Sequence, residues 1–123
     1  RGSALKRFNL FLRWMVRPAD GVDLGVWSHL GAHRLLIPLD AHVFRTSRAL
    51  GLTRRKTPNL KAVKEVTYAL QQIAPLDPLR YDFSLAHLGI SGACQGRRIA
   101  EVCHECSLKD LCRLDETGDI LAD

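Results

Sequence analysis

The chain has 123 residues and a formal net charge of +5, with 46% hydrophobic and 25% charged residues, a composition that indicates one folded domain and excludes wholesale disorder. No apolar run reaches the roughly 20 residues of a membrane span, because Arg13 and Arg17 interrupt the stretch around 8–16. The chain also lacks a secretion signal at its start, so we expect no membrane association and a cytoplasmic setting in which thiols stay reduced.

The first predicted element is a helix that begins at Ser3, as its N-cap, and is ended by Pro18. Its apolar residues at helical spacing are Leu5, Phe8, Leu12 and Met15 or Val16. Residues 18–38 contain several Gly and Pro without a sustained period, so they are predicted to be a long connecting loop with a short helical turn near Trp27. A loop of this length is either functional or an insertion.

Two helices are predicted next. Asp40 is the expected N-cap of the first, which ends before Gly51. Asn59 is the expected N-cap of the second, which spans 60–74. The apolar stripe of this second helix consists of Leu60, Val63, Val66, Leu70 and Ile73. Its charged residues Lys61, Lys64 and Glu65 are interpreted as its solvated face.

The dipeptide Asp77-Pro78 has the form of an N-cap followed by proline at the first helical position, and it predicts a helix that ends at Gly89. Ser107 is expected to cap one further helical turn that runs through Cys112. The sequence has no strand pattern, repeat or low-complexity segment. The predicted fold class is therefore all-α.

The four cysteines are clustered near the end of the chain with the spacing C-x8-C-x2-C-x5-C. They are Cys94, Cys103, Cys106 and Cys112. In a reducing compartment such a group predicts the ligands of one metal centre in preference to two disulfides. On spacing alone, four thiolates satisfy a tetrahedral zinc ion as well as a 4Fe-4S cluster.

Charge is unevenly distributed along the chain. Residues 1–60 contain eleven Lys or Arg against three Asp, whereas residues 61–123 contain seven Lys or Arg against ten acidic residues. The asymmetry fits a phosphate-binding surface, although arginines scattered over a solvated helix are at least as common. The charge distribution alone therefore does not identify a binding partner.

Three segments resemble motifs of the helix-hairpin-helix DNA glycosylases, endonuclease III and its relatives. Their V-D-T-H-V-x-R-x-x-x-R-L segment resembles I37-P-L-D-A-H-V-F-R-T-S-R-A-L-G51. The second helix of their hairpin, with a G-x-G-R-K-T-A-N pattern, resembles G2-S-A-L-K-R-F-N-L-F-L12. The last two cysteine intervals equal those of their 4Fe-4S loop. The whole chain, including L10-F-L-R-W-M-V-R17, resembles still more closely the C-terminal half of a related bacterial family of uncharacterised proteins.

The resemblance implies that Asp40 is the catalytic carboxylate, that Lys6 is the Schiff-base lysine and that Asn9 matches the motif asparagine. It implies the C-terminal half of a helix-hairpin-helix glycosylase-like fold, with residues 1–93 as a DNA-facing helical segment and 94–123 as a cluster loop and tail. It favours a 4Fe-4S cluster over zinc. The implied partners are double-stranded DNA and an N-terminal half domain of the same protein, which we expect to be missing from this chain.

This sequence departs from the endonuclease III pattern at three points. Ala41 replaces the usual threonine, and the first cysteine interval is x8 instead of x6. The loop 18–38 also makes the separation of Lys6 and Asp40 much longer, so these two residues can meet only if the loop is an excursion.

We therefore expect a DNA glycosylase and AP lyase of base-excision repair, or its C-terminal half, that excises a damaged base through Lys6 and Asp40 and is active only in the intact protein. A non-catalytic DNA-binding or scaffold module with the same fold and cluster is the alternative, in which Asp40 only caps a helix. A small electron-transfer protein is a weaker one. The predicted DNA-binding residues are Gly2, Ser3, Ala4, Arg7, His42, Arg45, Arg48, Arg54 and Arg55.

Overall fold

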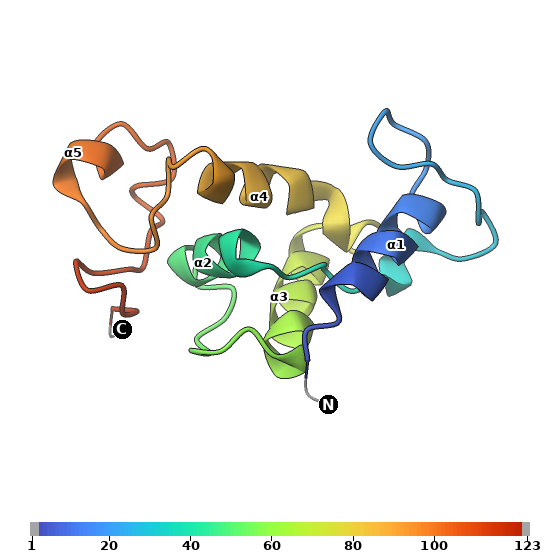
Figure 1. Cartoon of the computed structure of the whole chain (residues 1–123), viewed down its shortest axis with the longest axis horizontal. Coiled ribbons are helices and arrows are strands. Elements are labelled where there is room, and N and C mark those ends of the chain that lie inside the picture. The colour runs from blue at the N-terminus through green and yellow to red at the C-terminus, as the bar shows by residue number, and fades with distance from the viewer. Residues whose placement is uncertain (1–2, 122–123) are drawn as a thin grey trace.

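The computed structural model describes residues 3–121, which are helical and contain no strand, so the predicted all-α class is confirmed for this range. The helices in it are α1 (Lys6–Val16), α2 (Ala41–Ala49), α3 (Leu60–Ile73), α4 (Asp82–Ile90) and α5 (Ala100–Cys103), with the 3-10 helices η1 (Ala32–Arg34) and η2 (Pro78–Tyr81). Helices α2, α3 and α4 form the middle of the molecule, between α1 with its loop and α5 with the C-terminal segment (Figure 1). Of the described helices, none is long and apolar enough to cross a membrane.

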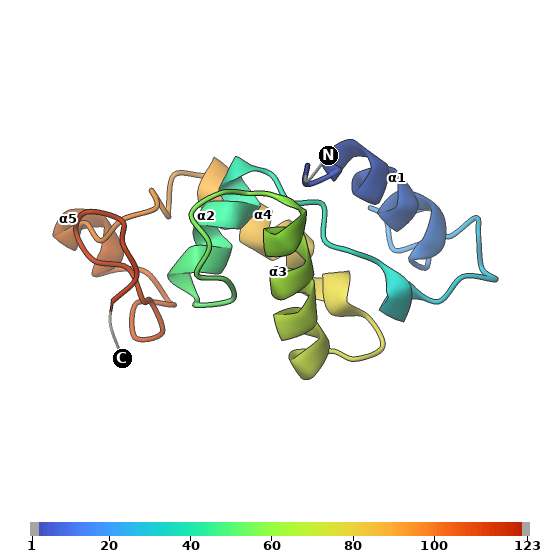
Figure 2. The same ribbon diagram turned by 90° about the horizontal axis from the view of Figure 1, so that it is seen from below.

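The hydrophobic core lies where α2, α3 and α4 meet the extended segment 35–39. Ile37, Val63 and Val66 are completely buried there. Figure 1 shows α3 running across the direction of α2 and α4, and Figure 2 shows all three helices in the middle of the molecule. Helices α2 and α4 can approach closely because Gly89 has no side chain. A Cβ atom at this position would lie only 2.7 Å from the Cβ of His42. Gly89 was predicted to end its helix, but α4 continues to Ile90, and the glycine instead permits this close contact.

The predicted caps of α2 and α3 are confirmed. The Asp40 side chain accepts a hydrogen bond of 2.9 Å from the Val43 amide, and the Asn59 side chain accepts one of 3.0 Å from the Ala62 amide. The predicted stripe of α3 is correct except at its end, where Ile73 is 62% exposed. Caps that act within one turn are local, and such signals can be found in a sequence.

The predicted cap at Ser3 is wrong, because α1 begins at Lys6 and the Ser3 hydroxyl accepts a hydrogen bond from Leu5, ahead of the helix. Asp77 does lie at the predicted N-cap position, of η2, with Pro78 at the first helical position. Its side chain makes no cap hydrogen bond, because its two oxygens accept from the Arg17 guanidinium at 2.8 and 2.7 Å. In both cases the side chain that was expected to cap a helix accepts hydrogen bonds from another group.

The predicted apolar stripe of α1 is correct only toward its C-terminal end, where Val16 is buried in the core and Leu12 packs against it. Leu5 and Phe8 are 47% and 59% exposed, whereas Asn9 and Arg13 are buried. Sequence periodicity did not predict a buried Arg13, because a buried arginine is rare unless its charge is paired. The helical turn expected near Trp27 is η1, a few residues further along the chain.

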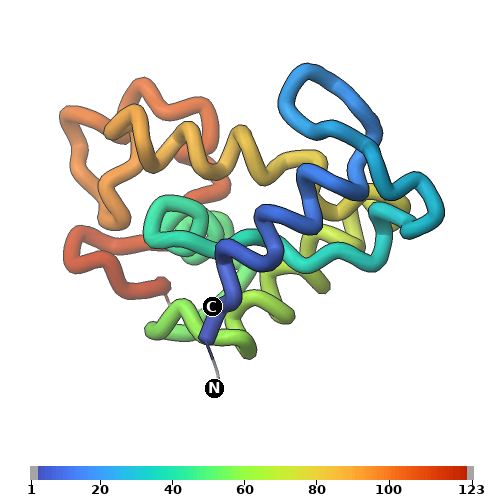
Figure 3. The backbone as a smooth tube through the Cα atoms, turned by 45° about the vertical axis from the view of Figure 1, so that its right-hand side comes forward, coloured from blue at the N-terminus to red at the C-terminus, as the bar shows by residue number. Residues whose placement is uncertain are grey.

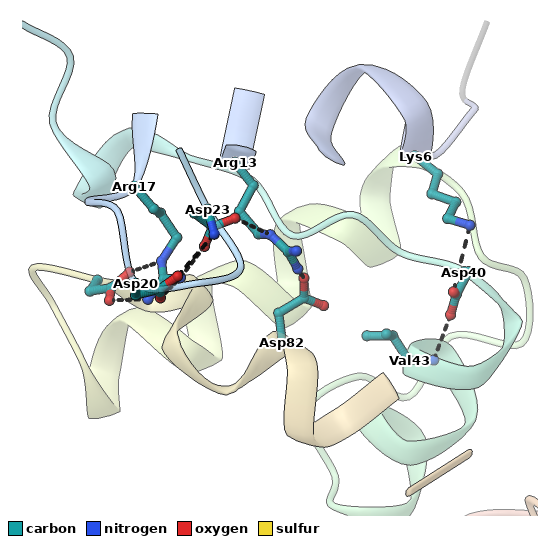
Figure 4. A network of polar contacts seen from close by, with 9 residues as sticks. Lys6, Arg13, Arg17, Asp20, Asp23, Asp40, Val43 and Asp82 are labelled. Carbon is teal, nitrogen blue, oxygen red and sulfur yellow. Dashed lines mark hydrogen bonds and ion pairs between the residues drawn. The ribbon is translucent and has the colours of Figure 1, made fainter. Parts of the chain in front are cut away.

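A buried ion network compensates this charge (Figure 4). Arg13 donates to Asp23 at 3.0 Å and also to Asp82, and Arg17 donates to the other oxygen of Asp23. Burial raises the pKa of Asp82 to about 6, although the charge and hydrogen bond of Arg13 act in the opposite direction. The network fastens α1 to the loop that follows it and to α4.

Replacing Asp23 with Asn should destabilise the fold by about 3 kcal/mol. The substitution removes from a buried network the negative charge that pairs with both arginines. The Asp23 side chain is completely buried and contacts both Arg13 and Arg17. Denaturant unfolding measures the loss. Asp20→Asn is the matched control, since Asp20 contacts Arg17 from a side chain that is 45% exposed. Equal stability of the two variants would contradict the assigned role of Asp23.

Candidate functional site

Lys6 and Asp40, which are well separated in the sequence, lie side by side at the starts of α1 and α2. The Lys6 Nζ atom is 3.7 Å from Asp40 Oδ2, and Figures 3 and 4 show these two helix starts together. The Lys6 side chain is 47% exposed and that of Asp40 is 25% exposed, so a ligand can reach both. The loop 18–38 is thus an excursion that returns the chain to α1.

Asp40 is held in place by the core segment that precedes it. Leu35, Ile37 and Leu39 are buried, and the Ile37 amide donates to the Thr67 hydroxyl at 3.0 Å. One oxygen of Asp40 accepts the cap hydrogen bond, which leaves the other oxygen facing Lys6. As the N-cap residue, Asp40 lies at the positive end of the α2 helix dipole.

The turn before Lys6 has an unusual backbone. Leu5 has φ 53° and ψ 38°, a left-handed conformation that a leucine adopts only when its surroundings impose it. Asn9 contributes to this constraint, because its buried side-chain amide donates to the Ala4 carbonyl at 3.3 Å. The asparagine that follows the lysine by one helical turn therefore fixes the turn that presents the lysine.

The predicted DNA contacts on α2 lie against other parts of the protein. His42 Nδ1 is 2.7 Å from an Arg45 guanidinium nitrogen, and the Arg45 side chain packs closely on Gly96. Arg48 donates to the Gly118 carbonyl at 3.0 Å. These two arginines therefore contact the C-terminal segment, and they do not lie beside Lys6.

The remaining predicted DNA-binding residues are at the surface. Arg7, Arg54 and Arg55 are exposed, and Ser3 and Ala4 lie before the first turn of α1, not within it as expected. Gly2 lies outside the described residues. The structure thus brings Lys6 and Asp40 together but distributes the predicted phosphate contacts over separate surfaces.

The four cysteines line one pocket between α2, α4 and the C-terminal segment, and none forms a disulfide. Apolar side chains form much of the wall. The charged residues that line it are Arg97, Arg98 and Lys109. Within residues 3–121, no three or more His, Cys, Asp or Glu side chains are placed to hold a metal ion as they stand. Residues 107–111 form successive turns, not the helical turn predicted to begin at Ser107, and the unpredicted helix α5 ends at Cys103.

The environment of these sulfurs is that of closely spaced thiols. Burial raises the pKa of the Cys94 thiol, the Gly96 amide opposes this effect, and the charges of the other three cysteines raise the pKa further. The Ile99 amide donates to Cys103 Sγ at 3.3 Å. A metal centre bound by all four sulfurs would relieve the repulsion between them.

The loop that contains the cysteines is held by hydrogen bonds from a residue that was not predicted to have a role. Arg98, between the first two cysteines, donates to the carbonyls of Cys112 and Leu114 at 3.1 and 3.2 Å, and its own amide donates to the Asp115 carbonyl at 2.8 Å. Leu114 is buried and pairs with Ile120 in an antiparallel bridge. Arginine contacts with backbone carbonyls leave no pattern in a sequence, so only a structure identifies them.

Arg98→Gln should loosen the last cysteine segment by about 1–2 kcal/mol, since it removes two charge-assisted hydrogen bonds from a half-buried side chain. Amide hydrogen exchange at residues 112–116 should become roughly tenfold faster. Arg97→Gln is the control, because Arg97 is exposed and forms none of these bonds. Similar exchange rates in both variants would contradict the assignment.

The model of a family described as "Protein of unknown function (DUF2400)" matches residues 1–91. The matched range includes Lys6, Asn9 and Asp40 and ends shortly before Cys94. No curated protein and no solved structure matches the chain. The family description names no activity.

Proposed function

The chain belongs to this DUF2400 family of proteins of unknown function, and we propose that it is a DNA glycosylase and AP lyase of base-excision repair, or a part of one. The observation that carries the proposal is the 3.7 Å approach of Lys6 Nζ to Asp40 Oδ2. An amine beside a carboxylate, open to a ligand, provides the two groups that base excision through an imine requires. The resemblance to helix-hairpin-helix glycosylases implies the same roles for the same two residues.

The proposed reaction divides the work between the two side chains. Once a nucleotide has left the base stack, Asp40 places a negative charge near the sugar, which becomes positive as the base departs with the bonding electron pair. The departing base takes up the proton of the Lys6 ammonium group, and the amine that remains forms a bond to the same sugar carbon. Loss of a proton and opening of the sugar ring give an imine, which permits strand cleavage by elimination.

We also propose that Cys94, Cys103, Cys106 and Cys112 bind a 4Fe-4S cluster, with zinc as the alternative. The proposal is supported by the single pocket that all four line, by its apolar wall and by the three cations in it, which suit an anionic group shielded from water. Such a cluster, when bound, supplies folding energy to its loop. The cytoplasm, where thiols stay reduced, is the expected compartment.

Borohydride trapping tests the catalytic proposal, because borohydride reduces an imine to a stable amine. The complete natural protein is incubated with a duplex that contains one abasic site, and the product is digested and analysed by mass spectrometry. We expect a covalent adduct on the peptide that contains Lys6. An adduct confined to another lysine would reject the assignment of Lys6.

A non-catalytic DNA-binding or scaffold module is the second candidate, and the ion pair itself favours it. Lys6 and Asp40 already neutralise each other, and Asp40 already caps α2, so both residues have roles that need no chemistry. The result that would support this candidate is DNA binding without any trapped adduct on abasic or oxidised-base duplexes.

A further inference from the structure

A basic hollow opens on the surface at the start of α3. Its lining residues are Arg55, Asn59, Leu60, Lys61 and Lys64. From the sequence, Lys61 and Lys64 are only the solvated face of a helix. In the structure, Lys61 and Lys64 line one concave surface together with Arg55 from the preceding loop. A helix face that is only solvated does not need to form such a surface.

Of the three cations of this basic hollow, Arg55 is paired with a carboxylate, that of Glu65. Arg55 Nε donates to Glu65 Oε2 at 2.5 Å, and the Thr53 hydroxyl holds the other oxygen of Glu65 at 2.8 Å. Among residues 3–121, neither Lys61 nor Lys64 forms an ion pair. They also lie one turn apart on the same helix face, where like charges repel each other. An anion in the hollow would relieve this repulsion.

The side chains, not the backbone amides, provide the binding groups. The Asn59 side chain already caps α3 by accepting a 3.0 Å hydrogen bond from Ala62. Arginine and lysine side chains are the usual partners of phosphate oxygens, and a phosphodiester offers one charge with two such oxygens. The hollow therefore suits the backbone of a nucleic acid.

The basic hollow lies close to the proposed catalytic pair. Ser3 forms an antiparallel bridge with Asn59, and Figures 1 and 2 show the first described residues beside the start of α3. Lys6 is three residues from Ser3, a distance of on the order of 10 Å at most along the chain. At about 3.4 Å per nucleotide step, the distance from Ser3, at the edge of the hollow, to Lys6 corresponds to roughly three nucleotides.

We propose that the basic hollow formed by Arg55, Lys61 and Lys64 binds a backbone phosphate of the same duplex DNA that presents a nucleotide to Lys6 and Asp40. The inference rests on the proposed function, because it takes DNA as the partner. It assigns Lys61 and Lys64 to DNA positioning, without a role in the chemistry.

The test compares the double variant Lys61→Gln/Lys64→Gln with the charge-matched control Arg34→Gln/Arg80→Gln. Arg34 and Arg80 are exposed and lie outside the basic hollow. Binding of an undamaged fluorescent duplex is measured by anisotropy over a range of salt concentrations. Each lost phosphate contact lowers the slope of log affinity against log salt by about 0.9, so the hollow variant, which loses its contact with one backbone phosphate, should lose about 0.9 and the control none.

Four results would overturn the inference. An unchanged slope in the hollow variant, or an equal loss in the control, would overturn it. Displacement of the duplex by inorganic phosphate at equal ionic strength would overturn it in favour of a small-anion site. Displacement by polyglutamate of equal charge would overturn it in favour of an acidic protein partner.

The two proposals fail in different experiments. The borohydride adduct of the unmodified protein on saturating abasic duplex tests the chemistry, whereas the salt slope of the hollow variant tests the hollow. A slope that falls as expected, together with no adduct in the unmodified protein, would support the hollow and reject the chemistry. An adduct with an unchanged slope would reject the hollow alone.

Discussion

Replacing Cys106 with Ser should remove the bound metal centre and unfold the segment between Cys94 and Cys112. This segment depends on its ligands because no residue from 92 to 113 belongs to the buried hydrophobic core. Anaerobically purified protein should be brown and contain iron and acid-labile sulfide in about equal amounts, whereas the variant should be colourless. Proteases should then cut the variant within 94–112 while the helices α1 to α4 resist.

Ser107→Ala is the matched control for this experiment. Ser107 is the exposed neighbour of Cys106 in the same loop, so its variant should keep iron and sulfide at the level of the unmodified protein. Stoichiometric zinc without sulfide in the unmodified protein would reject the cluster and leave a zinc site. Unchanged protease resistance after loss of the metal would show that the centre does not hold the loop.

The elements that could be predicted from the sequence are those with local signals. Asp40 and Asn59 cap helices whose apolar stripes begin within one turn, so the signal and the structure lie within a few residues. The lysine and the carboxylate of the candidate site could be named as well, because each lies in a short motif. Their approach depends on how the loop 18–38 returns, which no local pattern specifies.

The buried face of α1 shows where local reasoning fails. Arg13 is buried because Asp23 and Asp82 reach it from a loop and from another helix. A charged side chain is buried in a protein only when groups of opposite charge are buried beside it. Which carboxylates will pair with a given arginine cannot be predicted from their spacing in the sequence. The buried Arg13 and the exposed Phe8 are therefore the part of this helix that the sequence pattern did not predict.

The cysteine loop is an intermediate case. The spacing of the thiols predicted one site, and the structure places all four around one pocket. The path of the chain between them could not be predicted, because Arg98 and the bridge between Leu114 and Ile120 hold it through backbone contacts. Spacing identifies candidate ligands, whereas the folding of a loop depends on contacts of this non-local kind.

Lys6→Gln should abolish the trapped adduct on every substrate, because glutamine has no nucleophilic amine. Asp40→Asn should act differently on two substrates. On a duplex with an oxidised base, release of the base should slow by roughly 10²–10³-fold, since a charge that stabilises the transition state is lost. On an abasic duplex, where the base has already left, adduct formation should persist. Rates of strand cleavage and trapping on the two duplexes measure both effects in the complete natural protein.

The controls separate the charge of Asp40 from its role as a cap. Asparagine and serine can both accept the Val43 amide hydrogen bond, so Asp40→Asn and Asp40→Ser should keep the helix content measured by circular dichroism and slow base release by similar factors. Lys56→Gln removes an exposed positive charge without removing the amine beside Asp40, and it should still form the adduct. If Asp40→Asn released an oxidised base as fast as the unmodified protein, the carboxylate would have no catalytic role. Asp40 would then be a helix cap paired with a lysine, as the scaffold interpretation requires.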